Sequence, residues 1–182
     1  MLHLPLKDRG FTLVELMLVV AVFATVMAMA VPMSGRMLES IKLNSTAREV
    51  ERELQSARLK AVSVNRRIRV AFNCPVAGQF RTVEYIGTPA IDNATNRCLL
   101  TAYPAVPDND PATRPNFDGP VRQLQDGMTV TTRRFEFRPD GTAWEIVANT
   151  PTAIANTASV VVTKSSKTKT VTVNALGKVV LQ

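Results

Sequence analysis

Few residues of this chain are of a type that could carry out acid–base, nucleophilic or metal chemistry. The only histidine, His3, lies close to the start, and the chain has no GxxxxGK[ST] phosphate-binding loop. The aspartates of the second half fall mostly in expected turns or loops, where this residue is common; they are Asp92, Asp108, Asp110, Asp118, Asp126 and Asp140. We therefore expect no enzyme activity, no cofactor and no metal site; a carboxylate enzyme is the catalytic alternative that stays open.

One carboxylate inside a long apolar run suggests a different kind of chemistry. The 21 residues from Phe11 to Val31 contain a single charged side chain, Glu15. At about 1.5 Å per residue, a helix of this length reaches ~30 Å, the thickness of a membrane's hydrocarbon layer. A charge inside such a span is costly and indicates a function. Lys7 and Arg9 precede the run, so the positive-inside rule places the start of the chain in the cytoplasm.

Three interpretations of this run compete. A buried core helix fits poorly, because a basic flank precedes 21 nearly uninterrupted apolar residues. A cleavable secretory signal is the second, since Ala28-Met29-Ala30 resembles an A-x-A cleavage site and would release a periplasmic protein that starts at Val31. Against it, the run is longer than a usual signal and contains Glu15.

The third interpretation rests on a motif. Gly10-Phe11-Thr12-Leu13-Val14-Glu15 resembles the processing site of type IV pilins and pseudopilins. The resemblance implies cleavage by a prepilin peptidase between Gly10 and Phe11, followed by N-methylation of Phe11. It also implies that Glu15 meets the N-terminal amine of a neighbouring subunit, which would satisfy its buried charge. Pro32 matches a family proline that bends or loosens the helix.

After Pro32 the pattern is that of an amphipathic helix. Apolar residues recur in steps of three and four: Ala47, Val50, Leu54, Ala57, Ala61 and Val64. We expect Met37, Leu38 and Ile41 to extend this stripe. The boundaries predicted are a leader over 1–10, a transmembrane and filament-core helix over 11–32, its amphipathic continuation over 33–64 and a β-rich head over 65–182.

Alternating apolar residues predict the strands of the head. The expected strands are Ile68 to Phe72, Phe80 to Ile86, Cys98 to Tyr103, Phe135 to Arg138 paired with Thr142 to Val147, Ser159 to Thr163 paired with Thr168 to Val173, and Lys178 to Leu181. Between Pro104 and Pro120 we expect an irregular loop, because five of the eleven prolines lie there. A long helix followed by antiparallel strands predicts an α+β fold.

Three segments give a narrower resemblance, to the GspH/FimT group of minor pseudopilins and pilins. The segment Gln55 to Val62 is similar to the helix end of that group, and Phe137-Arg138-Pro139-Asp140-Gly141 to its aromatic-x-Pro-x-Gly turn. Gly177-Lys178-Val179 stands where the group often has a Gly-Arg-x-Arg ending. The resemblance implies a type IV pilin-like fold.

The two cysteines, Cys74 and Cys98, both fall in the expected exported head. An oxidising periplasm would permit a disulfide between them. The closed loop of 25 residues would then stabilise the head by roughly 3.5 kcal/mol in the chain-entropy model. Two unpaired thiols are the alternative.

The expected function is structural: a minor pseudopilin or pilin of a type II secretion system or type IV pilus, at or near the filament tip. Its expected partners are the prepilin peptidase, other pilins of the filament, an inner-membrane assembly platform and the lipid bilayer. The chain would cross the inner membrane once, with a cytoplasmic N-terminus and a periplasmic head. The sequence does not discriminate between secretion, pilus and DNA-uptake machines.

A DNA-binding minor pilin is the alternative function. The formal net charge is +7, and four lysines near the end are candidate DNA contacts: Lys164, Lys167, Lys169 and Lys178. The ending departs from the group's pattern, since Lys178 and Val180 replace the two arginines. Because such lysines also protect edge strands from aggregation, the structural role is favoured.

Overall fold

The computed structural model describes residues 11–105, 117–125 and 127–182. It comprises two compact units, residues 1–39 and 40–182, and each is considered by itself. One helix, α1, runs from Leu13 to Ser63 and contributes to both units. The second unit, called the head below, also contains the short helix α2, Pro89–Asp92.

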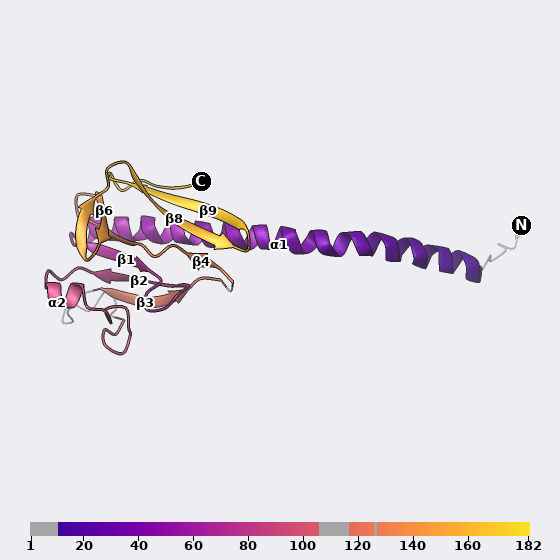
Figure 1. Ribbon diagram of the computed structural model, residues 1–182, viewed down its shortest axis with the longest axis horizontal. Coiled ribbons are helices and arrows are strands. Elements are labelled where there is room, and N and C mark those ends of the chain that lie inside the picture. The colour runs from indigo at the N-terminus through magenta and orange to yellow at the C-terminus, as the bar shows by residue number, and fades with distance from the viewer. Residues whose placement is uncertain (1–10, 106–116, 126) are drawn as a thin grey trace, which may run out of the picture. The chain divides into compact units, whose positions relative to one another are not determined.

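Among the described residues of the head, ten strands form two antiparallel sheets, whose arrangement Figure 1 shows. The six-stranded sheet has the order β3-β2-β1-β5-β6-β7 and the four-stranded sheet the order β10-β9-β8-β4. The bounds are β1 Ile68–Phe72, β2 Gln79–Glu84, β3 Asp118–Gln123, β4 Thr129–Val130, β5 Arg134–Phe137, β6 Ala143–Val147, β7 Thr150–Ala153, β8 Thr157–Lys164, β9 Lys167–Asn174 and β10 Val179–Leu181.

The head part of α1 supplies one wall of the core. The predicted stripe is confirmed at Ala47, Val50, Leu54, Ala57 and Ala61, which are all buried. Val50, Leu54, Ala57 and Ala61 pack with apolar side chains from both sheets, such as Phe135 of β5 and Val160 of β8. The chain therefore has the predicted α+β fold, with α1 packed against antiparallel sheets.

The prediction of this stripe is wrong at its two ends. Met37, Leu38 and Ile41 are exposed, and Leu43 and Thr46 are buried in the turns that follow. Val64 is also exposed, because α1 ends at Ser63 and Asn65 takes a left-handed conformation with φ 53°. A left-handed residue directly after a helix redirects the chain, so Val64 leaves the apolar face.

Most predicted strands are confirmed, including β1, the β5–β6 and β8–β9 hairpins and β10. The strand predicted from Cys98 to Tyr103 is wrong, since turns occupy this segment and the N–H of Tyr103 donates to the carbonyl of Leu99. The strand predicted to reach Ile86 ends at Glu84. The loop expected up to Pro120 is also wrong in its last part, because β3 begins at Asp118; residues 106–116 lie outside the described residues.

Candidate functional site

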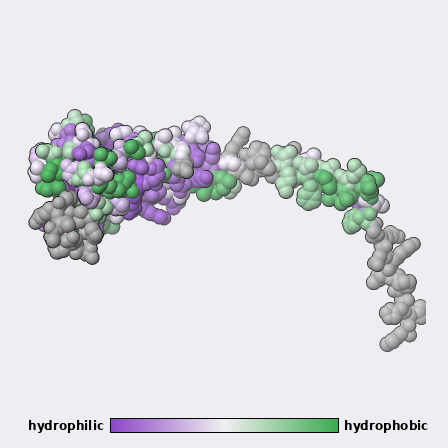
Figure 2. Space-filling model, turned by 90° about the horizontal axis from the view of Figure 1, so that it is seen from below, coloured by the Kyte–Doolittle hydropathy of each residue, from purple (hydrophilic) through white to green (hydrophobic). Residues whose placement is uncertain are grey.

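The first half of α1 presents an exposed apolar surface. Its large side chains are 40–74% exposed from Leu13 to Met27, and Figure 2 shows this stretch as hydrophobic. Glu15 is exposed in the first turn, where its backbone N–H donates to Thr12 Oγ1 at 3.3 Å. An apolar surface of this extent marks a contact with a partner or a membrane.

Two features expected of this half are the membrane span and the processing site. Among the described residues, no helix combines the length and apolar character of a membrane span, so the span expected over residues 11–32 is not confirmed. Gly10 lies outside the described residues, while Phe11 is described and 80% exposed. The helix is continuous through Pro32, and the bending expected there stays a prediction.

In the head, three segments that are far apart in the sequence meet at Arg58 of α1. Arg58 Nε donates to the carbonyl oxygen of Gly141 at 3.0 Å. Gly177 packs against the same two residues so closely that an added Cβ atom would collide with the Gly141 carbonyl and the Arg58 side chain. The N–H of Ala143 donates to the carbonyl of Ala175 at 2.9 Å. The helix end, the Pro-Asp-Gly turn and the C-terminal glycine thus form one junction.

Asp140 stabilises the turn at this junction. Its Oδ1 accepts hydrogen bonds from the Thr142 hydroxyl at 2.7 Å and the Thr142 N–H at 2.9 Å. These two bonds favour the charged carboxylate and lower the pKa of Asp140 below its usual 3.8. The stabilisation is therefore present above pH 3.8 and is lost as the pH falls through the lower, folded-state value.

This gives a pH-dependent prediction for Asp140→Asn. The variant keeps an oxygen acceptor and loses only the titrating charge. We expect wild type to melt at a higher temperature than the variant at about pH 6, and the difference to shrink toward about pH 2. Thermal melts followed by circular dichroism at several pH values would measure it. A difference that grows on acidification would contradict the assignment.

The face of the six-stranded sheet that faces away from α1 is charged and covered. Each of the five residues of β1 is buried, which requires cover on both faces. Residues 85–105, which follow β2 and contain α2, supply the second cover and are called the covering segment below. Arg81 holds this segment by donating to the carbonyls of Arg97 (3.3 Å) and Tyr103 (2.7 Å), and it also donates to the carbonyl of Gly119 in β3 (2.7 Å).

An ion pair and a disulfide fasten the same covering segment. Arg97, 5% exposed, donates to both carboxylate oxygens of Asp118, which is fully buried, and Nη2 lies 2.7 Å from Oδ1. Burial raises the pKa of Asp118, although Arg97 and the N–H of Glu84 oppose this. Cys74 and Cys98 form a disulfide with a Cα–Cα distance of 5.5 Å. The segment is thus held by charge, hydrogen bonds and a covalent link.

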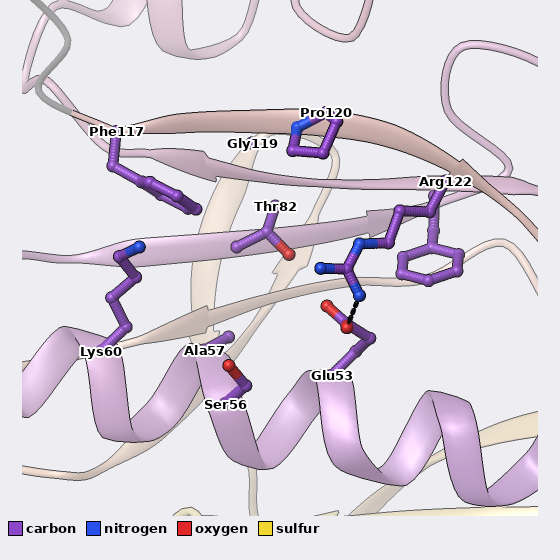
Figure 3. A pocket seen from close by; sticks show the side chains of 10 residues that line it. Glu53, Ser56, Ala57, Lys60, Thr82, Phe117, Gly119, Pro120 and Arg122 are labelled. Carbon is purple, nitrogen blue, oxygen red and sulfur yellow. Dashed lines mark hydrogen bonds and ion pairs between the residues drawn. The ribbon is translucent and has the colours of Figure 1, made fainter. Parts of the chain in front are cut away.

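A pocket of about 250 Å³ lies between α1 and the strands β2 and β3 (Figure 3). At one end the Lys60 ammonium lies 3.2 Å from the centroid of the Phe117 ring, and at the other Arg122 pairs with Glu53. Both pairs bridge the helix and the edge of the sheet. The described residues contain no group of three His, Cys, Asp or Glu arranged to hold a metal. The groups of this pocket serve to attach helix to sheet.

Comparison with known families accounts for this arrangement. Residues 46–177 match the model of the type II transport protein GspH, and residues 6–31 match the prokaryotic N-terminal methylation motif. The chain belongs to the GspH family. The first match spans α1 of the head and both sheets, including the junction at Arg58, and the second covers the exposed apolar half of α1.

The comparisons with individual proteins are weaker. Two crystal structures of the type IV minor pilin FimU from Pseudomonas aeruginosa, in space groups P65 and P21, are similar to the chain with TM-scores of 0.46 and 0.47. Their sequence identities are 15% and 16%, and they cover 77% and 79% of this chain and 92% and 90% of FimU. A search of the curated protein sequences finds no match.

The structure of this GspH-family chain separates the four C-terminal lysines. Lys164 and Lys167 are opposite each other in the strand register at the turn between β8 and β9, and Lys169 follows on β9 opposite Val162. Lys178 lies beyond the other end of β9, just before β10. A strand of this length spans roughly 25 Å, so Lys178 and the other three lysines do not form one cluster. Lys178 lines a recess beside Arg58 and Gly177 instead.

The sequence patterns did not predict the charged face of the six-stranded sheet that faces away from α1. Asp118 and Asp92 were assigned to turns or loops, whereas Asp118 is buried in β3 and Asp92 is buried at the end of α2. The sequence did contain a signal. Arg69 stands between the core residues Ile68 and Val70, and Arg81 follows Phe80, so the alternation places both arginines on the face away from the core. The covering segment then buries them there. A buried arginine requires an acid or several carbonyls as partners.

Proposed function

We propose that this GspH-family chain is a minor pseudopilin or pilin, cut by a prepilin peptidase between Gly10 and Phe11 and N-methylated at Phe11. The observation that carries this proposal is the exposed apolar half of α1, which directly follows the cleavage motif and contains one carboxylate, Glu15. A lone charge on an apolar surface needs a partner when that surface becomes buried. The new amine of Phe11 on a neighbouring subunit would supply it.

The same surface supports the proposed location. Before assembly, residues 11–32 would cross the inner membrane once, with the leader in the cytoplasm and the head in the periplasm. On assembly, the apolar side chains would exchange lipid for the helices of other pilins, with the inner-membrane platform as a further partner. Exposed Met37, Leu38 and Ile41 would extend this contact surface toward the head.

The position in the filament and the machine are finer parts of the proposal. We place the subunit at or near the tip of a type II secretion filament or a type IV pilus. The alternative of a DNA-uptake pilin with lysine contacts stays a prediction. It is less supported, because Lys178 lies far from Lys164, Lys167 and Lys169.

The processing step gives a direct test. In cells with a prepilin peptidase, the intact mass of the membrane-bound protein should correspond to a chain that lacks residues 1–10 and carries one extra methyl group. Gly10→Val should abolish the cleavage, because a branched side chain cannot take the place of glycine at the cut. Gly35→Ala is a matched control, since its added Cβ meets nothing within 4 Å. A soluble chain that starts at Val31 would overturn the proposal.

A further inference from the structure

A second pocket, of about 360 Å³, lies between the outer face of the six-stranded sheet and the covering segment. It is defined here as the arginine pocket, because Arg69, Arg97 and Arg134 line it. Buried Ala71 and Val83 form part of its wall, and the exposed residues Thr95 and Asn149 lie at its rim. Asp92 is the one carboxylate among the lining residues, and both its oxygens already accept backbone N–H groups, from Ile86 and Gly87.

Two of the three arginines have their charge balanced by the protein. Arg69 Nε donates to Glu136 Oε2 at 2.9 Å, and Nη1 donates to the carbonyl of Asp92. Arg97 is paired with Asp118 as described above. These two guanidinium groups therefore shape the pocket and are not free to neutralise a ligand.

Arg134 differs from both. Its Nη2 donates to Asn149 Oδ1 at 2.8 Å, which is a neutral acceptor, and no carboxylate among the described residues pairs with it. A guanidinium has five N–H donors, so four have no protein acceptor in the described part of the chain. The side chain is half-buried. A guanidinium that is partly shielded from water and has unused N–H donors can bind an anion.

The surroundings add to the positive potential at this point. Desolvation by burial, and secondly the neighbouring Arg69 guanidinium, lower the pKa of Arg134, although an arginine stays charged at neutral pH. Glu136, two residues from Arg134 on β5, is already shared by Arg67, Arg69 and Arg138. Arg97 also has a buried Nε–H without an acceptor. The arginines on this face of the sheet thus carry more positive charge than its carboxylates neutralise.

We infer that the arginine pocket is a binding site for a carboxylate, and that the guanidinium of Arg134, which has no acidic partner among the described residues, binds an aspartate or glutamate side chain of a protein partner. The flat fork of a guanidinium matches a carboxylate through two parallel hydrogen bonds. Asn149 holds Arg134 in place from one side and leaves the rest of the fork available. The inference does not depend on the filament role proposed above.

The geometry favours a protein carboxylate over a nucleic acid. Binding along a phosphate backbone uses several exposed cations in a row, often with aromatic side chains for base stacking. The arginine pocket offers one unpaired cation inside a recess, and no aromatic ring of its lining is exposed. A single acidic side chain that projects from a protein surface fits such a recess.

The test uses the full, detergent-solubilised chain labelled with ¹⁵N, and an acidic probe with a neutral twin. The probes are the capped pentapeptides Gly-Gly-Asp-Gly-Gly and Gly-Gly-Asn-Gly-Gly. We expect the aspartate peptide to shift the Arg134 Nε–Hε resonance in a saturable way and the asparagine peptide not to. Arg134→Gln should weaken binding of the aspartate peptide by about 10- to 100-fold, as loss of hydrogen bonds to a charged group implies.

Arg133→Gln is the matched control, because this neighbouring arginine pairs with Glu145 and does not line the pocket. It should bind the aspartate peptide as wild type does. If Arg134→Gln fails to fold, Arg134→Lys replaces it, and weaker binding is again expected because the fork is lost. Equal binding of the two peptides, or equal loss in the Arg133 and Arg134 variants, would overturn the inference. Tighter binding of a single-stranded oligonucleotide at Arg134 would overturn it in favour of nucleic acid.

Discussion

Asp118→Asn is expected to lower the free energy of unfolding of the head by about 3–5 kcal/mol. The substitution preserves shape and removes one charge. Asp118 is fully buried and Arg97 is 5% exposed, so water cannot replace the lost carboxylate. Arg97 would then be a buried cation without a counter-charge, and Arg81, whose guanidinium is also buried, would lose its nearest acid. The loss of stability comes mainly from these buried guanidinium groups, which no longer have a counter-charge.

Urea unfolding of the full chain in detergent would measure the effect. Trp144, the only tryptophan, lies in the head with the Arg138 guanidinium 3.7 Å from its ring and serves as a fluorescence probe. Glu53→Gln is the contrasting control, because its partner Arg122 is 49% exposed and such pairs contribute about 0–1 kcal/mol. If the two variants lose similar stability, the buried pair does not have the importance assigned to it.

Removal of the disulfide should cost a comparable amount. The bridge between Cys74 and Cys98 joins residues separated by 24 positions. The chain-entropy model gives about 3.5 kcal/mol for a loop of this size, within the roughly 2–5 kcal/mol seen when small exported domains lose a native bridge. The bridge also ties the covering segment to the end of β1, so its loss should expose Arg81 and Asp118 to water.

The measurement is a pair of urea titrations with and without a thiol reductant. Wild type should lose stability when reduced, and the Cys74→Ser, Cys98→Ser double variant should match reduced wild type in both conditions. The double variant also controls for direct effects of the reductant. Unchanged stability of wild type on reduction would show that the covering segment is held by its hydrogen bonds and ion pairs alone.

Local patterns determined the elements of this protein. A helical stripe from Ala47 to Ala61 and alternating strands such as Ile68 to Phe72 have a period that the sequence displays directly. The failures have local causes too. Cys98 to Tyr103 has strand-like composition, but the segment forms turns because it must cross the sheet and bring Cys98 to Cys74. β7 was missed because Pro151 and small polar residues are typical of loops, and an edge strand tolerates them.

The processing motif was also present in the sequence alone, since it consists of consecutive residues around Gly10 and Phe11, and the narrower family resemblance rests on short segments such as Phe137 to Gly141. Tertiary structure decided which distant residues meet. It brought Arg58, Gly141 and Gly177 into one junction and separated Lys178 from the other lysines. It also paired Arg97 with Asp118, while no acid of the described residues pairs with Arg134. Whether a charged side chain has a counter-charge depends on which strands lie beside its own. The local pattern of apolar residues predicts strands but does not determine their order in the sheet.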